Sequence, residues 1–230
     1  MTILLLVLTA IIAYGFGNIS GCMLLTRLVL KKHRNKYCAP ECSPQDFYRD
    51  FGPVWTAALG LFEAVKTVLV VLIGGCLLGI RDQVTVGRLF AMFCLLMGQR
   101  YPLLFFFKGG KALFQAGVAI FVVDWRVGLC CWVAYVVVVI FTRYASLGGV
   151  VAAVAAPIFL WVFDFEGLAC PLALLCALLI VLGYAENLLR LVRGTEPHCF
   201  DFGGKAKAAG APEEQEEDEF DLDELDSGDY

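Results

Sequence analysis

The sequence predicts an all-α integral membrane protein with about seven transmembrane helices. Of its 230 residues, 60% are hydrophobic and only 17% are charged, and the mean hydropathy is +0.75. Soluble domains are normally about one quarter charged and less than half apolar. The apolar residues also form long runs, and the charged residues gather between these runs and at the C-terminal end. A soluble core of this size could not bury so much apolar surface, whereas a lipid bilayer can cover it.

The apolar runs follow one another along the chain. Ile3–Leu30 is the first, and because no basic segment precedes it, we interpret it as a retained span and not as a cleaved signal peptide. Ala112–Val123 is short for a crossing and indicates a tilted or re-entrant segment. The other runs are Val54–Ile80, Val86–Met97 with an interruption at Gln99–Pro102, Val127–Thr142, Leu147–Phe163 and Leu168–Leu189.

The connections between the runs alternate in charge. The odd-numbered connections and the C-terminal end are basic, while the even-numbered connections are mixed or acidic. Since basic loops stay in the cytoplasm, the pattern predicts an outer N-terminus and a cytoplasmic C-terminus. The basic residues of the odd-numbered connections and of the C-terminal end are Lys31, Lys32, Arg34, Lys36, Arg49, Lys108, Lys111, Arg143, Arg190, Arg193, Lys205 and Lys207.

The domain organisation predicted is a transmembrane domain at residues 1–196 and a cytoplasmic acidic tail at residues 197–230. Half of the 22 acidic residues lie between Glu213 and Asp229. Such a run repels itself and cannot bury a core, so we expect it to be disordered. It either keeps the chain soluble at this end or docks a basic partner, and the composition leaves both open.

Cysteine is frequent, with ten residues, but a disulfide framework is not expected. Seven cysteines lie in apolar runs, where the thiol behaves as a small hydrophobic group: Cys22, Cys76, Cys94, Cys130, Cys131, Cys170 and Cys176. Cys38, Cys42 and Cys199 fall in segments predicted to be cytoplasmic, where thiols stay reduced. With His33 and His198 they offer ligands for a tetrahedral metal. Their loose spacing favours unpaired thiols, and we expect no metal and no cofactor.

A basic, glycine-rich stretch, Phe107–Lys111, is suited to holding an anion. Gly109 and Gly110 let backbone N–H groups approach a phosphate, and Lys108 and Lys111 add positive charge. A plain basic turn at the membrane edge explains the same residues equally well.

Several polar residues interrupt the apolar runs. Gln99 and Arg100 either face a site inside the bundle, or Arg100 reaches the interface beside a helix break. Glu63 and Lys66 are three residues apart on one helix face, which favours a structural pair. Asn187, near the inner end of the last run, is best interpreted as a hydrogen-bonding group of a site.

Five blocks in this order resemble the bacterial acyl-phosphate:glycerol-3-phosphate acyltransferase family, over nearly all of the chain before residue 197. Gly98–Pro102 followed by Phe107–Lys111 is similar to the family's Gly-His-x-x-Pro and Phe-Lys-Gly-Gly-Lys-Gly. Phe62–Lys66 resembles Phe-Asp-x-x-Lys. The remaining blocks are Ala13–Ser20, Tyr144–Gly148 and Glu186–Glu196.

The resemblance implies a bacterial inner-membrane enzyme with its active site at the cytoplasmic face. It would transfer a fatty acyl group from acyl-phosphate to the 1-hydroxyl of glycerol 3-phosphate, giving lysophosphatidic acid for phospholipid synthesis. No metal, nucleotide or nucleic-acid partner is implied. Arg49 and Asn187 correspond to catalytic residues. The residues implied to bind the substrates are Lys108, Gly109, Gly110, Lys111, Ser146 and Glu196.

The sequence also departs from the family pattern. The family's glycine-rich first signature is replaced by Tyr37–Asp46, which contains two prolines and no glycine. Gln99 and Tyr184 stand where the family has histidine, and Ala112 stands where it has glycine. These differences leave open a catalytically inactive paralogue that serves as a membrane binding or regulatory module. A small transporter is a third possibility.

Overall fold

The computed structural model describes residues 2–26, 44–80, 83–103, 109–110, 112–163 and 167–193. The chain divides into two units, Met1–Phe200 and Asp201–Tyr230, and the second lies outside the described residues. The predicted domain boundary at residue 196 and the predicted disorder of the tail therefore stay predictions. The first unit consists of α1 (Thr2–Asn18), α2 (Gly21–Leu25), α3 (Pro44–Gly79), α4 (Val84–Arg100), α5 (Leu113–Val123), α6 (Trp125–Thr142), α7 (Ala145–Val162), α8 (Ala169–Gly183) and α9 (Ala185–Val192).

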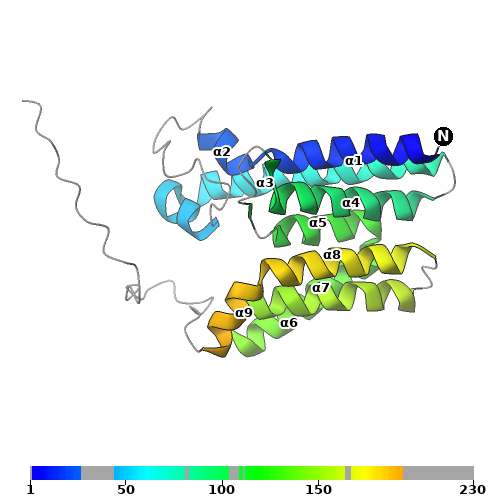
Figure 1. Ribbon diagram of the computed structural model, residues 1–230. Coiled ribbons are helices and arrows are strands. Elements are labelled where there is room, and N and C mark those ends of the chain that lie inside the picture. The colour runs from blue at the N-terminus through cyan, green and yellow to red at the C-terminus, as the bar shows by residue number, and fades with distance from the viewer. Residues whose placement is uncertain are drawn as a thin grey trace, which may run out of the picture. The chain divides into compact units, whose positions relative to one another are not determined.

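The long helices of this unit run side by side in alternating directions (Figure 1). We call the end at which α1, α4, α6 and α8 finish the α9 end, because α2 and α9 also lie there (Figure 1). The other end, where α1 begins, is the N-terminal end. Each predicted span corresponds to one of α1, α3, α4, α5, α6, α7 and α8. The all-helical fold class is confirmed, while the number of complete crossings and the orientation stay predictions.

Length and composition mark three helical stretches as able to cross a membrane: Phe51–Gly79, Trp125–Thr142 and Ala145–Val162. Ile3–Asn18, Leu113–Val123 and Ala169–Gly183 are apolar but shorter. Large hydrophobic side chains are exposed along α1, α3, α6, α7 and α8. A surface of this kind suits contact with lipid.

Two of the predicted spans are broken. The prediction of one continuous run over Ile3–Leu30 is wrong, because α1 ends at Asn18 and a second helix begins at Gly21. Leu168–Leu189 is likewise divided, since α8 ends at Gly183 and Tyr184 separates it from α9. The second break follows Gly183, and glycine commonly ends helices. The sequence also changes at this point, from the wholly apolar α8 to α9, which contains charged residues.

The third helix starts earlier than predicted and contains a kink. It begins at Pro44 instead of Val54, and Gly52 adopts φ 83° and ψ 178°. Glycine tolerates this positive φ, and the following Pro53 has no N–H to continue the hydrogen-bonding pattern. Arg49, predicted to lie in a loop, is therefore part of the first segment of α3.

Helix α4 is the centre of the bundle and packs against α1, α3, α5 and α8. Glycines allow these close contacts. A Cβ on Gly17 would lie 2.5 Å from the carbonyl oxygen of Leu95, and one on Gly87 would lie 2.4 Å from that of Gly74. Small residues at such crossings are typical of helices that pack within a membrane.

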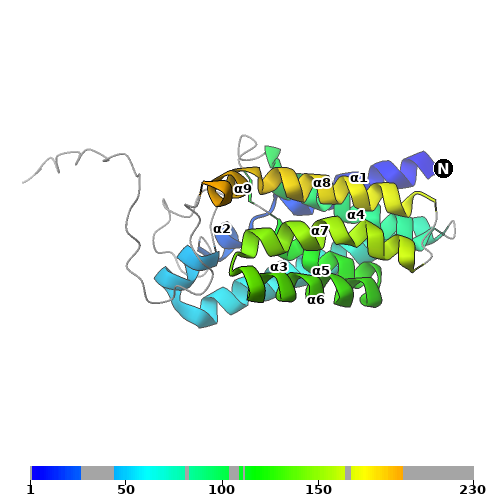
Figure 2. The same cartoon turned by 90° about the horizontal axis from the view of Figure 1, so that it is seen from below.

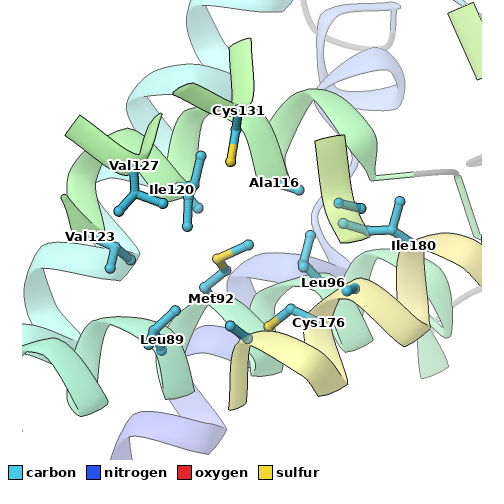
Figure 3. Packing of buried hydrophobic residues seen from close by; sticks show 14 of the residues in the cluster. Leu89, Met92, Leu96, Ala116, Ile120, Val123, Val127, Cys131, Cys176 and Ile180 are labelled. Atoms are coloured by element: carbon cyan, nitrogen blue, oxygen red, sulfur yellow. The ribbon is translucent and has the colours of Figure 1, made fainter. Parts of the chain in front are cut away.

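The largest buried cluster joins α4 and α5 to α6, α7 and α8. Figure 3 shows Met92 of α4 close to Ile120 of α5 and to Cys176 of α8. Cys131 and Cys176 are both buried in this apolar packing, as their sequence context predicts. Seen from below in Figure 2, the helices keep the same near-parallel arrangement.

Candidate active site

The elements that carry the predicted site residues meet at the α9 end. These elements are the first segment of α3, the end of α4, the Gly109–Gly110 segment, the start of α7, and α9. Helix α9 packs against both α7 and α8. Segments that are far apart in sequence are thus brought to one end of the bundle (Figure 1).

Gly109 is buried against the last turn of α4. A Cβ at this position would lie 2.2 Å from the carbonyl oxygen of Gln99 and 2.3 Å from that of Arg100. The last carbonyl groups of a helix have no partner within it, so this turn is where another segment can approach. The sequence suggested that Gly109 leaves room for a phosphate. The structure adds a second requirement, because only glycine fits so closely against α4.

The end of α1 fastens the segment that follows α4. The Tyr14 hydroxyl donates to the Tyr101 carbonyl at 2.7 Å. Asn18 donates from Nδ2 to the Tyr14 carbonyl at 3.2 Å and accepts at Oδ1 from the Leu103 N–H at 2.9 Å. Neither Tyr14 nor Asn18 was predicted from the sequence to have a role. Asn18 was detectable as a polar residue within an apolar run.

Ser146 lies in the first turn of α7, two residues after the N-cap residue Tyr144. The residue is 3% exposed, and its Oγ has no hydrogen-bond partner among the residues that the structure describes. The first N–H groups of a helix lack partners within it and carry partial positive charge. A buried hydroxyl left unsatisfied at such a position fits a group that binds a ligand.

Ala112 adopts a left-handed conformation, with φ 54° and ψ 11°, directly before α5. This is the position at which the family pattern has glycine. A side chain there costs about 1–2 kcal/mol, because the Cβ crowds the following carbonyl. The loop before α5 therefore keeps a backbone conformation suited to glycine although the residue is alanine.

Gln99 and Arg100 occupy the end of α4 and are both partly buried. Gln99 Oε1 and Arg100 Nε are buried and have no hydrogen-bond partner among the described residues. The Arg100 guanidinium lies 5.9 Å from the centroid of the Tyr101 ring. The buried Nε favours the interpretation that these residues face the bundle interior.

Glu63 and Lys66 form the structural pair that the sequence predicts. Lys66 Nζ lies 2.6 Å from Glu63 Oε2, and both side chains are buried. Gln115 of α5 donates to the same carboxylate at 2.6 Å. Gln115 was not predicted from the sequence, although a glutamine in the apolar run Ala112–Val123 is the same kind of signal as Glu63.

Other predicted site residues are placed only in part. Asn187 lies in α9, and Arg49 is placed by its backbone in the first segment of α3. Lys108, Lys111 and Glu196 lie outside the described residues, and so does the Tyr37–Asp46 segment except for its last three residues. The possible ligands for a tetrahedral metal also lie outside the described residues; they are His33, Cys38, Cys42, His198 and Cys199.

Comparison with known proteins identifies the family. Residues 7–194 match the sequence family described as "Glycerol-3-phosphate acyltransferase". A protein named glycerol-3-phosphate acyltransferase from Shewanella sediminis is 34% identical over 197 residues, which cover 85% of this chain and 96% of that protein. One of the same name from Thermoanaerobacter pseudethanolicus is 28% identical over 190 residues, covering 83% of this chain and 93% of that protein.

Solved structures share the fold. Two crystal structures of PlsY (YgiH), an integral membrane glycerol 3-phosphate acyltransferase, superpose with TM-scores of 0.70 and 0.71. Each is 22% identical in sequence and covers 84% of this chain and 94% of its own. The first is the glycerol 3-phosphate form and the second the lysophosphatidic acid form. The protein described above belongs to the glycerol-3-phosphate acyltransferase family.

Proposed function

We propose that this chain transfers a fatty acyl group from acyl-phosphate to the 1-hydroxyl of glycerol 3-phosphate, at the α9 end of the bundle. Its membership of the glycerol-3-phosphate acyltransferase family supports an acyltransferase of phospholipid synthesis over an inactive membrane module. The observation that carries the location is the burial of Gly109 on the end of α4. It places the glycine pair at the same end as Ser146 and α9.

The chemistry fits the residues at this end. Both substrates carry phosphate, so Arg49, Lys108 and Lys111 supply the positive charge that binding requires. The substrate hydroxyl attacks the acyl carbonyl carbon and forms a new ester C–O bond. The bond between that carbon and the bridging phosphate oxygen breaks, and inorganic phosphate leaves. Holding hydroxyl and carbonyl in line supplies much of the acceleration.

The proton of the attacking hydroxyl needs an acceptor. Gln99 and Tyr184 stand where the family has histidine, so neither position offers an imidazole base. A phosphate oxygen of the substrates is then the base at hand, and the departing phosphate carries the proton away. Ser146 and Asn187 hold substrate oxygens by hydrogen bonds in this scheme.

The α9 end faces the cytoplasm of a bacterial inner membrane in this proposal. Arg143, Arg190 and Arg193 all lie at this end, after α6 and in or beside α9. A concentration of arginine on one side supports a cytoplasmic location under the positive-inside rule. The acidic tail at residues 197–230 would then also be cytoplasmic, where it is able to dock a basic partner.

The test is acyl transfer from palmitoyl-phosphate to labelled glycerol 3-phosphate by the purified protein. Lys111→Ala is the test variant, and Lys207→Ala, which removes the same charge from the C-terminal segment, is its matched control. We expect lysophosphatidic acid from the wild type and the control but not from Lys111→Ala. Folded wild-type protein that binds glycerol 3-phosphate without forming product would contradict the proposal and favour the inactive module.

A further inference from the structure

A buried network centred on Glu63 joins three parts of the chain at the α9 end. Glu63 and Lys66 lie one turn apart on α3 and form an ion pair of 2.6 Å. Their side chains are 12% and 3% exposed. A buried pair is costly unless further hydrogen bonds satisfy both ions, and here each ion has such bonds.

The network first satisfies the break between α1 and α2. Lys66 Nζ donates to the Ile19 carbonyl at 2.8 Å, and the Gly21 N–H donates to Glu63 Oε1 at 2.7 Å. Backbone groups at a helix break need partners from elsewhere in the protein when no water reaches them. A Cβ on Gly21 would lie 2.7 Å from Glu63 Oε1, so glycine permits this close contact.

The same carboxylate also holds the start of α5. Gln115 Nε2 donates to Glu63 Oε2 at 2.6 Å, and Gln115 is 4% exposed. Gln115 lies in the first turn of α5, three residues after Ala112. The short connection from Gly109–Gly110 to α5 therefore ends on a helix turn whose position Glu63 fixes.

Helix α2 extends this restraint to the segment that carries Arg49. Cys22 of α2 packs with Phe47 and Leu59 of α3 in a small buried cluster. The kink at Gly52 lies between Phe47 and Leu59 and separates the first segment of α3 from the rest. Because the N–H that opens α2 is bound to Glu63, the carboxylate also restrains the surface on which Phe47 packs.

We propose that Glu63 is a positioning residue, which holds the Arg49 segment and the Gly109–Gly110 segment in a fixed relation at the site. The inference rests on the proposed function, because it assigns those two segments to the binding of the substrate phosphates. Displacing a binding group by about 1 Å can reduce turnover by about 100-fold. A carboxylate buried deep in the bundle thus controls the geometry of a site that it does not touch.

An exchange of partners tests the proposal. Glu63→Gln puts an amide opposite the Gln115 amide, and Gln115→Glu puts two carboxylates together. The double variant Glu63→Gln/Gln115→Glu restores an amide-to-carboxylate hydrogen bond, and the amide oxygen introduced at position 63 remains able to accept from the Gly21 N–H. Because Lys66 Nζ and Gln115 Nε2 contact the same oxygen of Glu63, the carboxylate introduced at position 115 also stays beside Lys66. We expect each single variant to lower kcat/KM at least about 10-fold and the double variant to recover to within about 3-fold of the wild type.

The control is Thr67→Val in the same part of α3. Thr67 is fully buried and donates from Oγ1 to the Glu63 backbone carbonyl at 2.8 Å, but it does not bind the carboxylate. We expect this variant to lower the melting temperature and leave kcat/KM per folded molecule unchanged. Single exchange variants that lose stability in the same way, with normal kcat/KM and KM, would overturn the proposal.

Amide hydrogen exchange supplies a readout that does not depend on catalysis. In Glu63→Gln we expect faster exchange both at residues 20–26 and at residues 112–118, with unchanged exchange in α6 and α7. Faster exchange at both segments in a protein whose wild type makes no lysophosphatidic acid would uphold the network and reject the acyltransferase function. Unchanged exchange at both segments would reject the positioning role, whatever the activity of the wild type.

Discussion

The two ends of the helical unit satisfy their polar groups in different ways. At the N-terminal end, Arg88 Nη1 donates to the carbonyls of Val122 and Val123 at 3.0 and 3.2 Å, which completes the end of α5. Asp124 caps α6 by accepting from the N–H groups of Arg126 and Val127. Local hydrogen bonds therefore close the helix ends there.

The α9 end instead contains helix breaks, left-handed residues and unsatisfied polar atoms. The two non-glycine residues with positive φ in the described part of the chain, Ala112 and Arg143, both lie at this end. Of the five buried polar side-chain atoms without a hydrogen-bond partner among the described residues, only Arg88 Nε belongs to the other end. Such costs persist mostly where function requires them, which supports the proposal that the chemistry takes place at the α9 end.

The largest effect is expected from Gly109→Ala. The added Cβ would overlap the carbonyl oxygens of Gln99 and Arg100 and push the glycine-rich segment away from α4. We expect kcat/KM to fall at least about 100-fold, because the proposed phosphate-binding groups move with the segment. Gly15→Ala is the matched control, since a Cβ on Gly15 meets nothing within 4 Å. A Gly109→Ala enzyme as active as the control would remove this segment from the site.

Ser146→Ala should separate activity from stability. The Ser146 hydroxyl is buried without a partner among the described residues, so removing it leaves the melting temperature equal or slightly higher. We expect kcat/KM to fall about 10- to 100-fold, the value of one hydrogen bond to a charged group. A lower melting temperature with full activity would show that the hydroxyl serves the fold.

Arg88→Met should give the opposite result. The variant removes the hydrogen bonds to the last carbonyls of α5 and leaves those carbonyls without their charged donor. We expect a loss of about 2 kcal/mol of unfolding free energy and unchanged kcat/KM per folded molecule. Denaturant unfolding in detergent, followed by an assay at matched folded concentration, checks both parts. A large loss of turnover in the folded fraction would break the division between the two ends.

Ala112→Gly should relieve strain at the α9 end. Glycine adopts the left-handed conformation of residue 112 without the crowding of a Cβ, although its freer unfolded chain offsets part of the gain. We expect a stabilisation of about 1 kcal/mol or less. The comparison variant is Ala145→Gly, in the first turn of α7, which should destabilise. Equal destabilisation by both would mean that Ala112 is not strained.

The smallest effect concerns pH at the N-terminal end. Hydrogen bonds from Arg126, mainly through its side chain, hold the pKa of Asp124 below its ordinary value. A lowered pKa means that this stabilisation is complete above the unfolded-state pKa and is lost as pH falls through the folded-state pKa. Asp124→Asn keeps the cap but not the charge. We expect it to melt slightly below the wild type at neutral pH and to match it once the pH has fallen below the folded-state pKa of Asp124.

Much of the fold could be predicted from the sequence, because lipid requires long apolar runs and basic residues mark one side. The breaks within the predicted spans could not be predicted in this way. The division between α1 and α2 is stabilised by Glu63 and Lys66, more than forty residues away, and nothing local to Ile19 indicates those partners. The kink at Gly52 had a local signal in the Gly52-Pro53 pair, which the long apolar run after it concealed.

The sequence pointed to the two glycines, Ser146 and Asn187 as candidate site residues, and their roles stay predictions. It did not point to the residues that hold the surrounding segments in place. Tyr14 and Asn18 act on a segment more than eighty residues further along the chain. The role of Gln115 follows only from the packing of α5 against α3, which brings its side chain to Glu63. Sequence patterns identify groups that bind a ligand by their type, whereas supporting residues are identified by their neighbours in space.

The difference between the two ends is tested most directly by a double-mutant cycle that joins them. Ser146→Ala, Arg88→Met and the double variant are compared for unfolding free energy and for kcat/KM per folded molecule. If the two ends are independent, the double variant combines the activity loss of Ser146→Ala with the stability loss of Arg88→Met, within about 0.5 kcal/mol. A double variant that departs from this sum by more than about 1 kcal/mol would contradict the separation of stability from chemistry.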